Sequence, residues 1–293
     1  MDGSQILQLA LSGLVTGSIY ALVALGFTVI FKSTDAINFA QGEWVMAGGM
    51  IGAFLHASFA LPPLLLVPIV TVVVAFIGLC SERLTIYPLR TPNPILLTLI
   101  TIAVAITTRA GVTLVLGKAP AGLPSFSGNE SIHFAGATLQ PQALWVIGIT
   151  LVVMFGTNIF FQRSLLGRAM RAAAADREAA GLVGIYVNRM VMWSFVLAAA
   201  IGAIAGLIIT PLTLTSVNVG LMLGFKGFSA AMLGGLGNLH GALLGGLVLG
   251  LLESLSAGLI SSQFKDVVAF VVLLIVLFLK PAGLLGRASA ERA

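Results

Sequence analysis

The side chains that could do chemistry in this chain are few, and the most suggestive fall at two glycine-containing interruptions of apolar sequence. One interruption covers residues 36–43 and the other covers residues 225–240. Broken helices expose backbone amide and carbonyl groups where a cavity can use them, so paired breaks indicate a translocation site. We therefore expect a substrate pathway at these breaks. Its candidate residues are Asn38, Phe39, Gln41, Gly42, Phe228, Ser229, Gly235, Gly237 and Asn238.

Glu43 and His240 stand at the edges of these interruptions, and each admits two interpretations. Either side chain could line the pathway, or it could be solvated at a membrane surface. We favour the second interpretation for each residue, because an interruption between two apolar runs commonly lies at such a surface.

Two ionisable residues, Arg109 and Glu253, fall inside expected membrane spans, where a charge is by default a functional hypothesis. Glu253 shares a helix face with Gly246 and Gly250, and this small-residue stripe either packs against another helix or lines a pore. A proton relay would need a neighbouring acid or histidine, and none is evident near Glu253. We expect Glu253 to anchor the packing stripe, and Arg109 to reach toward the surface from near the end of its span.

The sequence contains none of the usual catalytic or metal-binding constellations. Its three histidines, His56, His133 and His240, lie in separate segments without HExxH or another ligand spacing. No two acidic residues face each other within a span, and no serine stands in a GxSxG context. A nucleotide-binding GxxxxGKS/T motif is absent as well. We expect no enzyme activity, no metal site and no cofactor in this chain.

The composition places the chain in a membrane. Hydrophobic residues make up 58% and charged residues 9% of its 293 positions, whereas a soluble domain carries about 25% charged residues. Apolar runs long enough to span a bilayer recur along the chain, and they do not alternate as the strands of a membrane barrel do. We expect an all-α polytopic membrane protein in contact with lipid. The net charge is +5, and the lysines and arginines behind it lie in short loops. They therefore indicate the orientation of the chain in the membrane and not nucleic-acid binding.

The apolar runs predict about eight to nine crossings, including broken or re-entrant helices. The expected spans are Ile6–Phe31, Val45–Phe59, Leu64–Cys80, Ile95–Leu116, Gln142–Phe161, Met190–Thr210, a glycine-broken Leu221–Ile260, and Val267–Leu279. Each half of the glycine-broken segment is short for a full span, so we expect two half-helices there.

The polar segment 162–189 sets the orientation. It holds five of the fifteen basic residues, so the positive-inside rule makes it cytoplasmic. Counting spans backward makes the N-terminus external, and Lys280, Arg287 and Arg292 favour a cytoplasmic C-terminus.

The same segment predicts a docking element. Residues 168–181 are rich in alanine, which has the highest helix propensity, so we expect one short amphipathic helix there. Helices that lie on lipid usually carry larger apolar side chains. Small side chains suit insertion into a groove of a cytoplasmic partner protein.

An internal repeat relates two parts of the single domain 1–293, at about 6–116 and 189–280. A shift of 189 residues aligns Gly13 with Gly202 and Gly17 with Gly206, so a GxxxG falls at both places. An odd number of spans would separate the copies, which makes the repeat inverted, as in many transporters. Coincidence in glycine-rich sequence is the alternative.

Taken together, several motifs make the chain resemble the permease subunits of bacterial ABC importers, in the branched-chain amino-acid permease family. The resemblance covers nearly the whole chain. The matching stretches are Gly13–Phe31, Asn38–Gly42, Glu82–Arg90, Gly167–Ile185, Phe228–Gly237 and Gly250–Glu253. The sequence departs from the family pattern at two places, with Glu43-Trp44 after the first break and Asn238-Leu239-His240 after the second, and Trp44 and His240 could reshape the substrate path.

The resemblance implies partners and roles. Segment 162–189 resembles the coupling helix that docks on an ATPase subunit, so Gly167, Arg168, Arg171 and Asp176 would form the ATPase contact. ATP and Mg²⁺ would be bound by that ATPase and not by this chain. The resemblance also implies a second homologous permease, an external or periplasmic substrate-binding protein, and a location in the bacterial inner membrane.

The expected function is ATP-driven import of branched-chain or other hydrophobic amino acids by alternating access. Urea, amides and aromatic acids are alternative substrates within the family. A self-contained secondary transporter or channel would also use inverted repeats and broken helices, and a scaffold subunit is a third class. The basic helix distinguishes the first class, because only an ATP-driven importer needs it to bind an ATPase.

Overall fold

The computed structural model describes residues 3–89, 93–128, 130–134, 136–280 and 282–286. Arg90, Arg287 and Arg292 lie outside the described residues. The helices that position the site are α1 (Gly3–Thr34), α2 (Gln41–Phe59), α3 (Pro63–Ser81), α4 (Pro94–Leu116), α5 (Pro141–Arg163), α6 (Leu165–Ala175), α7 (Arg177–Leu182), α8 (Val187–Thr213), α9 (Val219–Gly234), α10 (Leu239–Leu259) and α11 (Lys265–Leu279). A π-helical turn (Glu82–Ile86) extends α3, and a 3₁₀ turn (Ser262–Phe264) precedes α11.

Within the described residues, seven helical segments are long and apolar enough to cross a membrane. They contain α1, α3, α4, α5, α8, α10 and α11. Helix α9 is apolar but shorter, and α2 carries Gln41 and Glu43 of the first interruption in its first turn. The prediction of an all-α polytopic membrane protein is confirmed.

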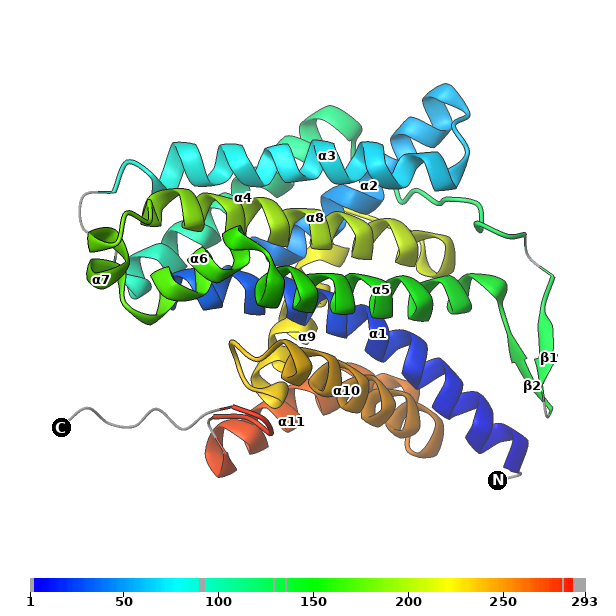
Figure 1. Ribbon diagram of the computed structural model, residues 1–293. Coiled ribbons are helices and arrows are strands. Elements are labelled where there is room, and N and C mark those ends of the chain that lie inside the picture. Colours follow the sequence, from blue (N-terminus) through cyan, green and yellow to red (C-terminus); the bar gives the residue numbers. More distant parts are fainter. Residues whose placement is uncertain (1–2, 90–92, 129, 135, 281, 287–293) are drawn as a thin grey trace.

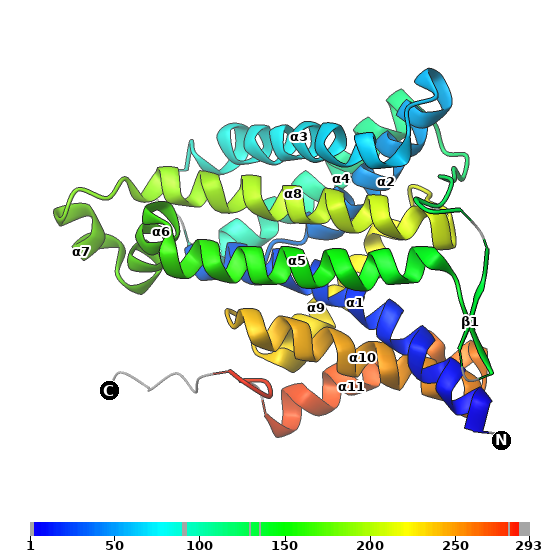
Figure 2. The ribbon, with the colours of Figure 1, turned by 45° about the vertical axis from the view of Figure 1, so that its right-hand side comes forward.

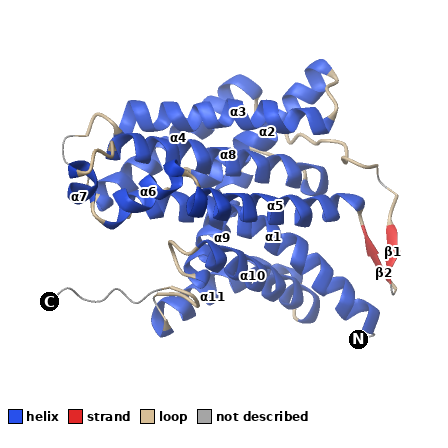
Figure 3. Cartoon of the chain, in the orientation of Figure 1, coloured by secondary structure: helices blue, strands red, loops and turns tan. Residues whose placement is uncertain are grey.

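The long helices run in two opposite directions (Figures 1 and 2). Helices α1, α3, α5 and α11 run one way, and α4, α8 and α10 run the other way. The short helices α6 and α7 lie at one end of the bundle (Figure 3). The N-terminal end of α1 lies at the other end, beside the only strands of the described chain, β1 (Ile132–Phe134) and β2 (Ala137–Leu139).

The β1–β2 hairpin is tied to the start of α1. Its strands pair antiparallel with His133 opposite Thr138. The side chain of Gln8 donates to the Thr138 carbonyl at 3.0 Å and accepts from the Thr138 amide at 2.7 Å. The long polar connection between α4 and α5 is therefore ordered against the bundle at this point.

Helix α1 is the centre of the bundle. It is buried from Gly17 to Ile30 and contacts α10, α8, α9 and α5. Its closest partner is α10, because a Cβ on Gly13 would lie 2.9 Å from the Cα of Leu251 and one on Gly17 would lie 2.8 Å from the Cα of Leu247. The glycine stripe of α10 therefore packs against a helix, as small residues at membrane interfaces do.

Helix α8 has a corresponding arrangement on the other side of the bundle. Gly202 and Gly206 face α2, where a Cβ on Gly202 would lie 3.2 Å from the Cβ of Trp44 and one on Gly206 would overlap the Val45 carbonyl. Helix α8 contacts α2 and α3, just as α1 contacts α9 and α10. Likewise α2 contacts α4, and α9 contacts α11. The series α1–α4 and α8–α11 thus make matching sets of contacts.

The two interruptions are narrower than expected. Gln41, Gly42 and Glu43 form the first turn of α2, while Phe228 and Ser229 lie inside α9. We expected two short half-helices between residues 221 and 260. Helix α9 is short, with 16 residues, but α10 is continuous over 21 residues, so the expectation is wrong for α10. A glycine inside a helix costs about 1 kcal/mol relative to alanine, but a backbone in lipid must bond to itself. Inside α10, Gly245, Gly246 and Gly250 mark close packing and not a break.

Candidate functional site

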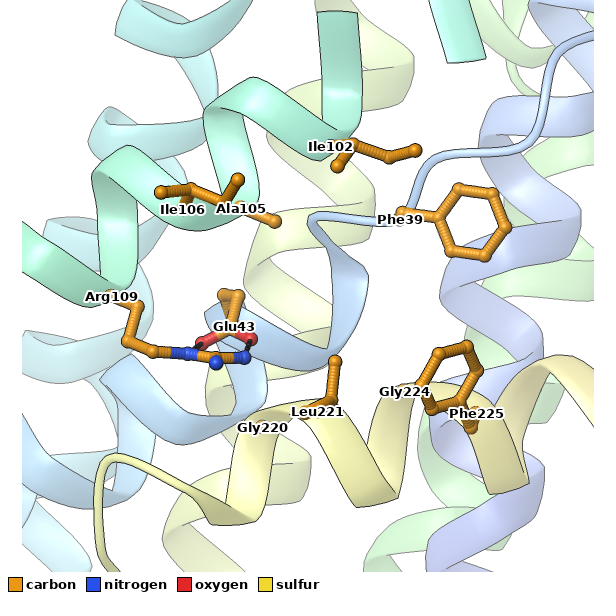
Figure 4. Close-up of a pocket in the computed structure, with 10 residues that line it drawn as sticks. All are labelled: Phe39, Glu43, Ile102, Ala105, Ile106, Arg109, Gly220, Leu221, Gly224 and Phe225. Carbon is orange, nitrogen blue, oxygen red and sulfur yellow. Dashed lines mark hydrogen bonds and ion pairs between the residues drawn. The ribbon is translucent and has the colours of Figure 1, made fainter. Parts of the chain in front are cut away.

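A cavity of about 420 Å³ lies between α2, α4 and α9 (Figure 4). Most of its wall is apolar, with the aromatic rings of Phe39 and Phe225 on one side. Side chains of α4 and α9, among them Ile102 and Leu221, complete that wall. The charged residues at the wall are Glu43 and Arg109.

Glu43 and Arg109 form a two-point ion pair across the α2–α4 contact. The Arg109 Nε donates to Glu43 Oε2 at 3.3 Å, and its Nη2 donates to Oε1. Side-chain exposure is 2% for Glu43 and 34% for Arg109. Gly220 leaves room for the carboxylate, since a Cβ there would lie 2.8 Å from Glu43 Oε2.

This geometry corrects two expectations. Glu43 is buried and is not solvated at a surface, and Arg109 binds Glu43 where we expected it to reach toward the surface. The pair joins residues 66 positions apart, so helical periodicity could not have found it. His240, in contrast, is exposed.

Of the first-break candidates, Phe39 lines the cavity and Asn38 and Gln41 do not. The Phe39 amide donates to Thr101 Oγ1 at 3.0 Å, which fixes the loop against α4. Asn38 Oδ1 accepts from the Ala40 amide at 3.1 Å, and Gln41 Nε2 donates to the Ala198 carbonyl at 3.1 Å. Both polar side chains are fully buried and hold the break in place.

Gly42 lies at the contact between α2 and α9. A Cβ at this position would overlap the Gly220 carbonyl and would lie 2.7 Å from the Cα of Gly224. Only glycine lets the two helix backbones approach this closely beside the cavity.

The second-break candidates divide into two groups. Phe228 is near the cavity, with its ring 5.9 Å from that of Phe39, and Ser229 is buried with its hydroxyl donating to the Phe225 carbonyl at 2.9 Å. Gly235, Gly237 and Asn238 form the α9–α10 turn. Gly235 and Gly237 have φ of 101° and 81°, a region that favours glycine.

Asn238 has a capping role at that turn. Its Oδ1 accepts from the amides of His240 and Gly241 at 3.0 and 3.2 Å, and its Nδ2 donates to the Leu285 carbonyl at 2.9 Å. This is the geometry of a helix N-cap. The structure therefore brings Phe39 and Phe228 together and places Gly42 beside the same cavity, while the turn residues lie elsewhere. A transport role for any of them stays a prediction.

A second buried charge network surrounds Glu253 and was missed in the sequence. Lys226 of α9 lies 2.9 Å from Glu253 and 2.6 Å from Asp266, and Lys265 lies 3.3 Å from Glu253. The Tyr20 hydroxyl donates to Glu253 Oε2 at 2.7 Å. Glu253 is thus part of an ion network as well as of the packing stripe. The signal that could have found it was a lysine inside a glycine-rich apolar run.

The polar segment between α5 and α8 forms two helices, so the expectation of one helix over 168–181 is wrong. Asp176 separates α6 from α7, and its Oδ1 accepts from the amides of Glu178 and Ala179 at 2.9 and 3.0 Å. Asp is a preferred N-cap, and here this preference outweighs the helix propensity of alanine.

Helix α6 has one covered face and one open face. Gly167, Met170 and Ala173 are buried, and a Cβ on Gly167 would overlap the α5 backbone at Phe160. Arg168 and Arg171 are exposed. Gly167 therefore seats α6 on the bundle, while the two arginines are available to a partner.

Among the residues that the structure describes, no three of His, Cys, Asp and Glu come together as metal ligands do. The groups that could interact with a ligand or partner are the two ion networks and the exposed arginines of α6. They can bind or orient a charged group.

Comparisons with known proteins give a consistent result. A family model described as "Branched-chain amino acid transport system / permease component" matches residues 9–277. The high-affinity branched-chain amino acid transport system permease protein BraD of Pseudomonas aeruginosa is 34% identical over 301 residues, covering 98% of this chain and 97% of BraD. The corresponding LivH of Escherichia coli (strain K12) is 35% identical with the same coverage. A probable LivH of Methanocaldococcus jannaschii is 26% identical, covering 93% of this chain and 90% of that protein.

Proposed function

This chain belongs to the family of branched-chain amino acid transport system permease components, and on this premise we propose how it works. It is the membrane permease subunit of an ATP-driven importer for branched-chain or other hydrophobic amino acids. Its relatives are transport components, so ATP hydrolysis belongs to a separate subunit. Binding of ATP and Mg²⁺ belongs to that subunit too.

The observation that carries this proposal beyond the family is the cavity between α2, α4 and α9. It lies beside the first interruption, within a bundle of membrane-length helices, and most of its wall is apolar. An apolar wall favours an amino acid with a hydrophobic side chain over urea or a short amide, because those molecules have little apolar surface to bury.

The α6–α7 end of the bundle is the cytoplasmic end in this proposal. The exposed arginines of α6 then face the cytoplasm, the start of α1 and the β1–β2 hairpin face outward, and α11 ends inside. The matching contacts of α1–α4 and α8–α11 support an inverted repeat whose two copies move against each other during alternating access.

The proposed assembly contains two ATPase subunits, a second homologous permease and an external substrate-binding protein in the bacterial inner membrane. Force from the ATPase enters through α6 and α7. Arg168 and Arg171 contact the ATPase, Gly167 seats α6 on α5, and Asp176 holds the junction between the two helices.

Charge reversal on α6 tests this proposal. Arg168→Glu combined with Arg171→Glu should abolish co-purification of the ATPase and ATP-driven uptake of L-leucine by the reconstituted complex. Lys118→Glu is the control, because Lys118 is exposed in the connection that leads from α4 toward the hairpin. An intact complex with full ATP-driven uptake would refute coupling through α6. Leucine uptake that needs no ATPase would instead support a self-contained transporter.

A further inference from the structure

We propose that the cavity between α2, α4 and α9 binds the amino acid in its zwitterionic form during transport. Glu43 receives the ammonium group, Arg109 receives the carboxylate, and the apolar wall receives the side chain. This inference rests on the proposed function and names the substrate chemistry of that site.

The cavity has a charged end and an apolar end. Figure 4 shows Glu43 and Arg109 together on one side and the rings of Phe39 and Phe225 on the other, with Ile102 above the space between. A molecule that is charged at one end and aliphatic at the other matches this distribution. A urea molecule or a short amide would leave the apolar end unfilled.

The ion pair can take up a zwitterion without being broken. A guanidinium has five N–H donors, and Glu43 is contacted by Nε and Nη2 of Arg109. Further donors remain for a substrate carboxylate. The Glu43 carboxylate offers about four lone-pair positions, so it can accept from an ammonium group while it stays bound to Arg109.

Charge balance favours a zwitterion over a simple ion. Glu43 and Arg109 together carry no net charge, and the carboxylate is desolvated, with 2% of Glu43 exposed. A lone cation or anion would add an unbalanced charge to this environment, which is costly in a low dielectric. A zwitterion adds one charge of each sign opposite its complement.

The size of the cavity suits this class of molecule. At about 420 Å³ it falls in the range of roughly 300–1,000 Å³ found for small-molecule pockets. A lipid acyl chain would fill the apolar wall equally well, but it offers nothing to the charged end. Charge complementarity therefore favours the amino acid.

The first test changes the charged end in the complete reconstituted complex, with uptake of L-leucine as the measurement. Arg109→Gln and Glu43→Gln should each lower uptake at limiting leucine about tenfold or more by raising the apparent KM, and Arg109→Lys should retain more uptake than Arg109→Gln. The amount of assembled complex, measured by size-exclusion chromatography, shows whether each variant folds.

The second test fills the cavity without touching the ion pair. Ala105 lines the cavity, whereas Ala103 lies on another face of the same helix. Ala105→Leu should lower L-leucine uptake several-fold and L-alanine uptake less, because the smaller side chain needs less of the apolar end. Ala103→Leu adds the same atoms elsewhere on α4 and should leave both rates unchanged.

The outcomes separate this inference from the proposed function. Unchanged leucine kinetics in both Arg109→Gln and Ala105→Leu would overturn the inference, while normal uptake by the wild-type complex keeps the permease function. Equal losses in Ala105→Leu and Ala103→Leu would also overturn it, since they would mark both faces of α4 as lipid or partner contacts. Absence of ATP-driven uptake in the wild-type complex would refute the proposed function itself.

Discussion

The ion pair between α2 and α4 and the charge network around α9 join corresponding helices but have opposite polarity. In the series α1–α4 the second helix supplies the acid, Glu43, and the fourth supplies the base, Arg109. In the series α8–α11 the second helix supplies the base, Lys226, and the fourth supplies an acid, Asp266. Each link joins the second helix of its series to the fourth, where the helix contacts also match.

The two links differ in their access to solvent. Arg109 is 34% exposed and lines the cavity between α2, α4 and α9, whereas Lys226 is 8% exposed and covers Glu253, which is 0% exposed. Two lysines, a tyrosine and two carboxylates surround that second site. A cavity of about 360 Å³ also reaches Lys226, Lys265 and Tyr20, so the difference lies in charge compensation: Lys226 has two carboxylate partners and Arg109 has one. The comparison teaches that a buried charge with several partners holds helices together, while a more exposed charge with spare donors is available to a ligand.

The largest expected effect is the loss of the buried cation. Lys226→Met keeps the length of the side chain but leaves Glu253 without its closest positive partner. Breaking a buried ion pair from one side costs about 3–5 kcal/mol, so the detergent-purified protein should lose most of its thermal stability, as measured by fluorescence-detected size-exclusion chromatography.

The double variant Lys226→Met with Glu253→Met is the matched control. It removes both buried charges, and Lys265 and Asp266 remain solvated because they are 47% and 50% exposed. Replacement of a buried pair by apolar residues is often close to neutral, so the double variant should be more stable than Lys226→Met. If the double variant is the less stable of the two, the network does not act through charge compensation.

Tyr20→Phe should have the next largest effect. It removes the hydroxyl that donates to Glu253 Oε2 at 2.7 Å and changes nothing else in shape. A hydrogen bond to a charged group contributes about 1.5–3 kcal/mol. The same thermal measurement should place this variant between the wild type and Lys226→Met. Wild-type stability in Tyr20→Phe would show that the lysines alone satisfy Glu253.

Arg109→Met tests the cavity side of the comparison. Because Arg109 is a third exposed, the cost should lie between those of exposed and buried pairs, at roughly 1–2 kcal/mol. Water in the cavity can then reach Glu43. A loss of thermal stability as large as that of Lys226→Met would mean that water does not reach Glu43 through the cavity. The two links would then not differ in their access to solvent. Leucine uptake should fall much more steeply than stability.

Much of the fold could be predicted from hydropathy, and the exceptions have physical causes. The run Ile95–Leu116 differs from α4 by one residue, because a bilayer demands a continuous apolar helix. The prediction is wrong at α10 because glycine has two roles in this chain. Gly235 lies in a turn, whereas Gly246 lies inside a helix at a close contact with α1.

The candidate site was predicted less completely than the fold, because its interactions are tertiary. The breaks pointed to Phe39, which lines the cavity. Glu43 and Arg109 are each candidates from the sequence alone, but nothing in the sequence pairs them across 66 residues. Hydropathy does not single out Lys226, because one charge hardly changes the mean of a long apolar run, although a buried lysine requires a carboxylate nearby.

The smallest expected effect belongs to Asp266→Asn, and it sharpens the comparison from within the buried network. Asp266 lies 2.6 Å from Lys226 but is 50% exposed, so water already screens its charge. Exposed pairs contribute about 0–1 kcal/mol, and Glu253 still compensates Lys226 in this variant. The thermal stability should therefore stay near that of the wild type. A loss comparable to that of Lys226→Met would show that the Lys226–Asp266 pair between α9 and α11, and not the Lys226–Glu253 pair between α9 and α10, provides most of the stabilisation. Because Asp266 lies on α11, the helix that corresponds to α4 and its Arg109, such a result would make the partly exposed member of each link the critical one.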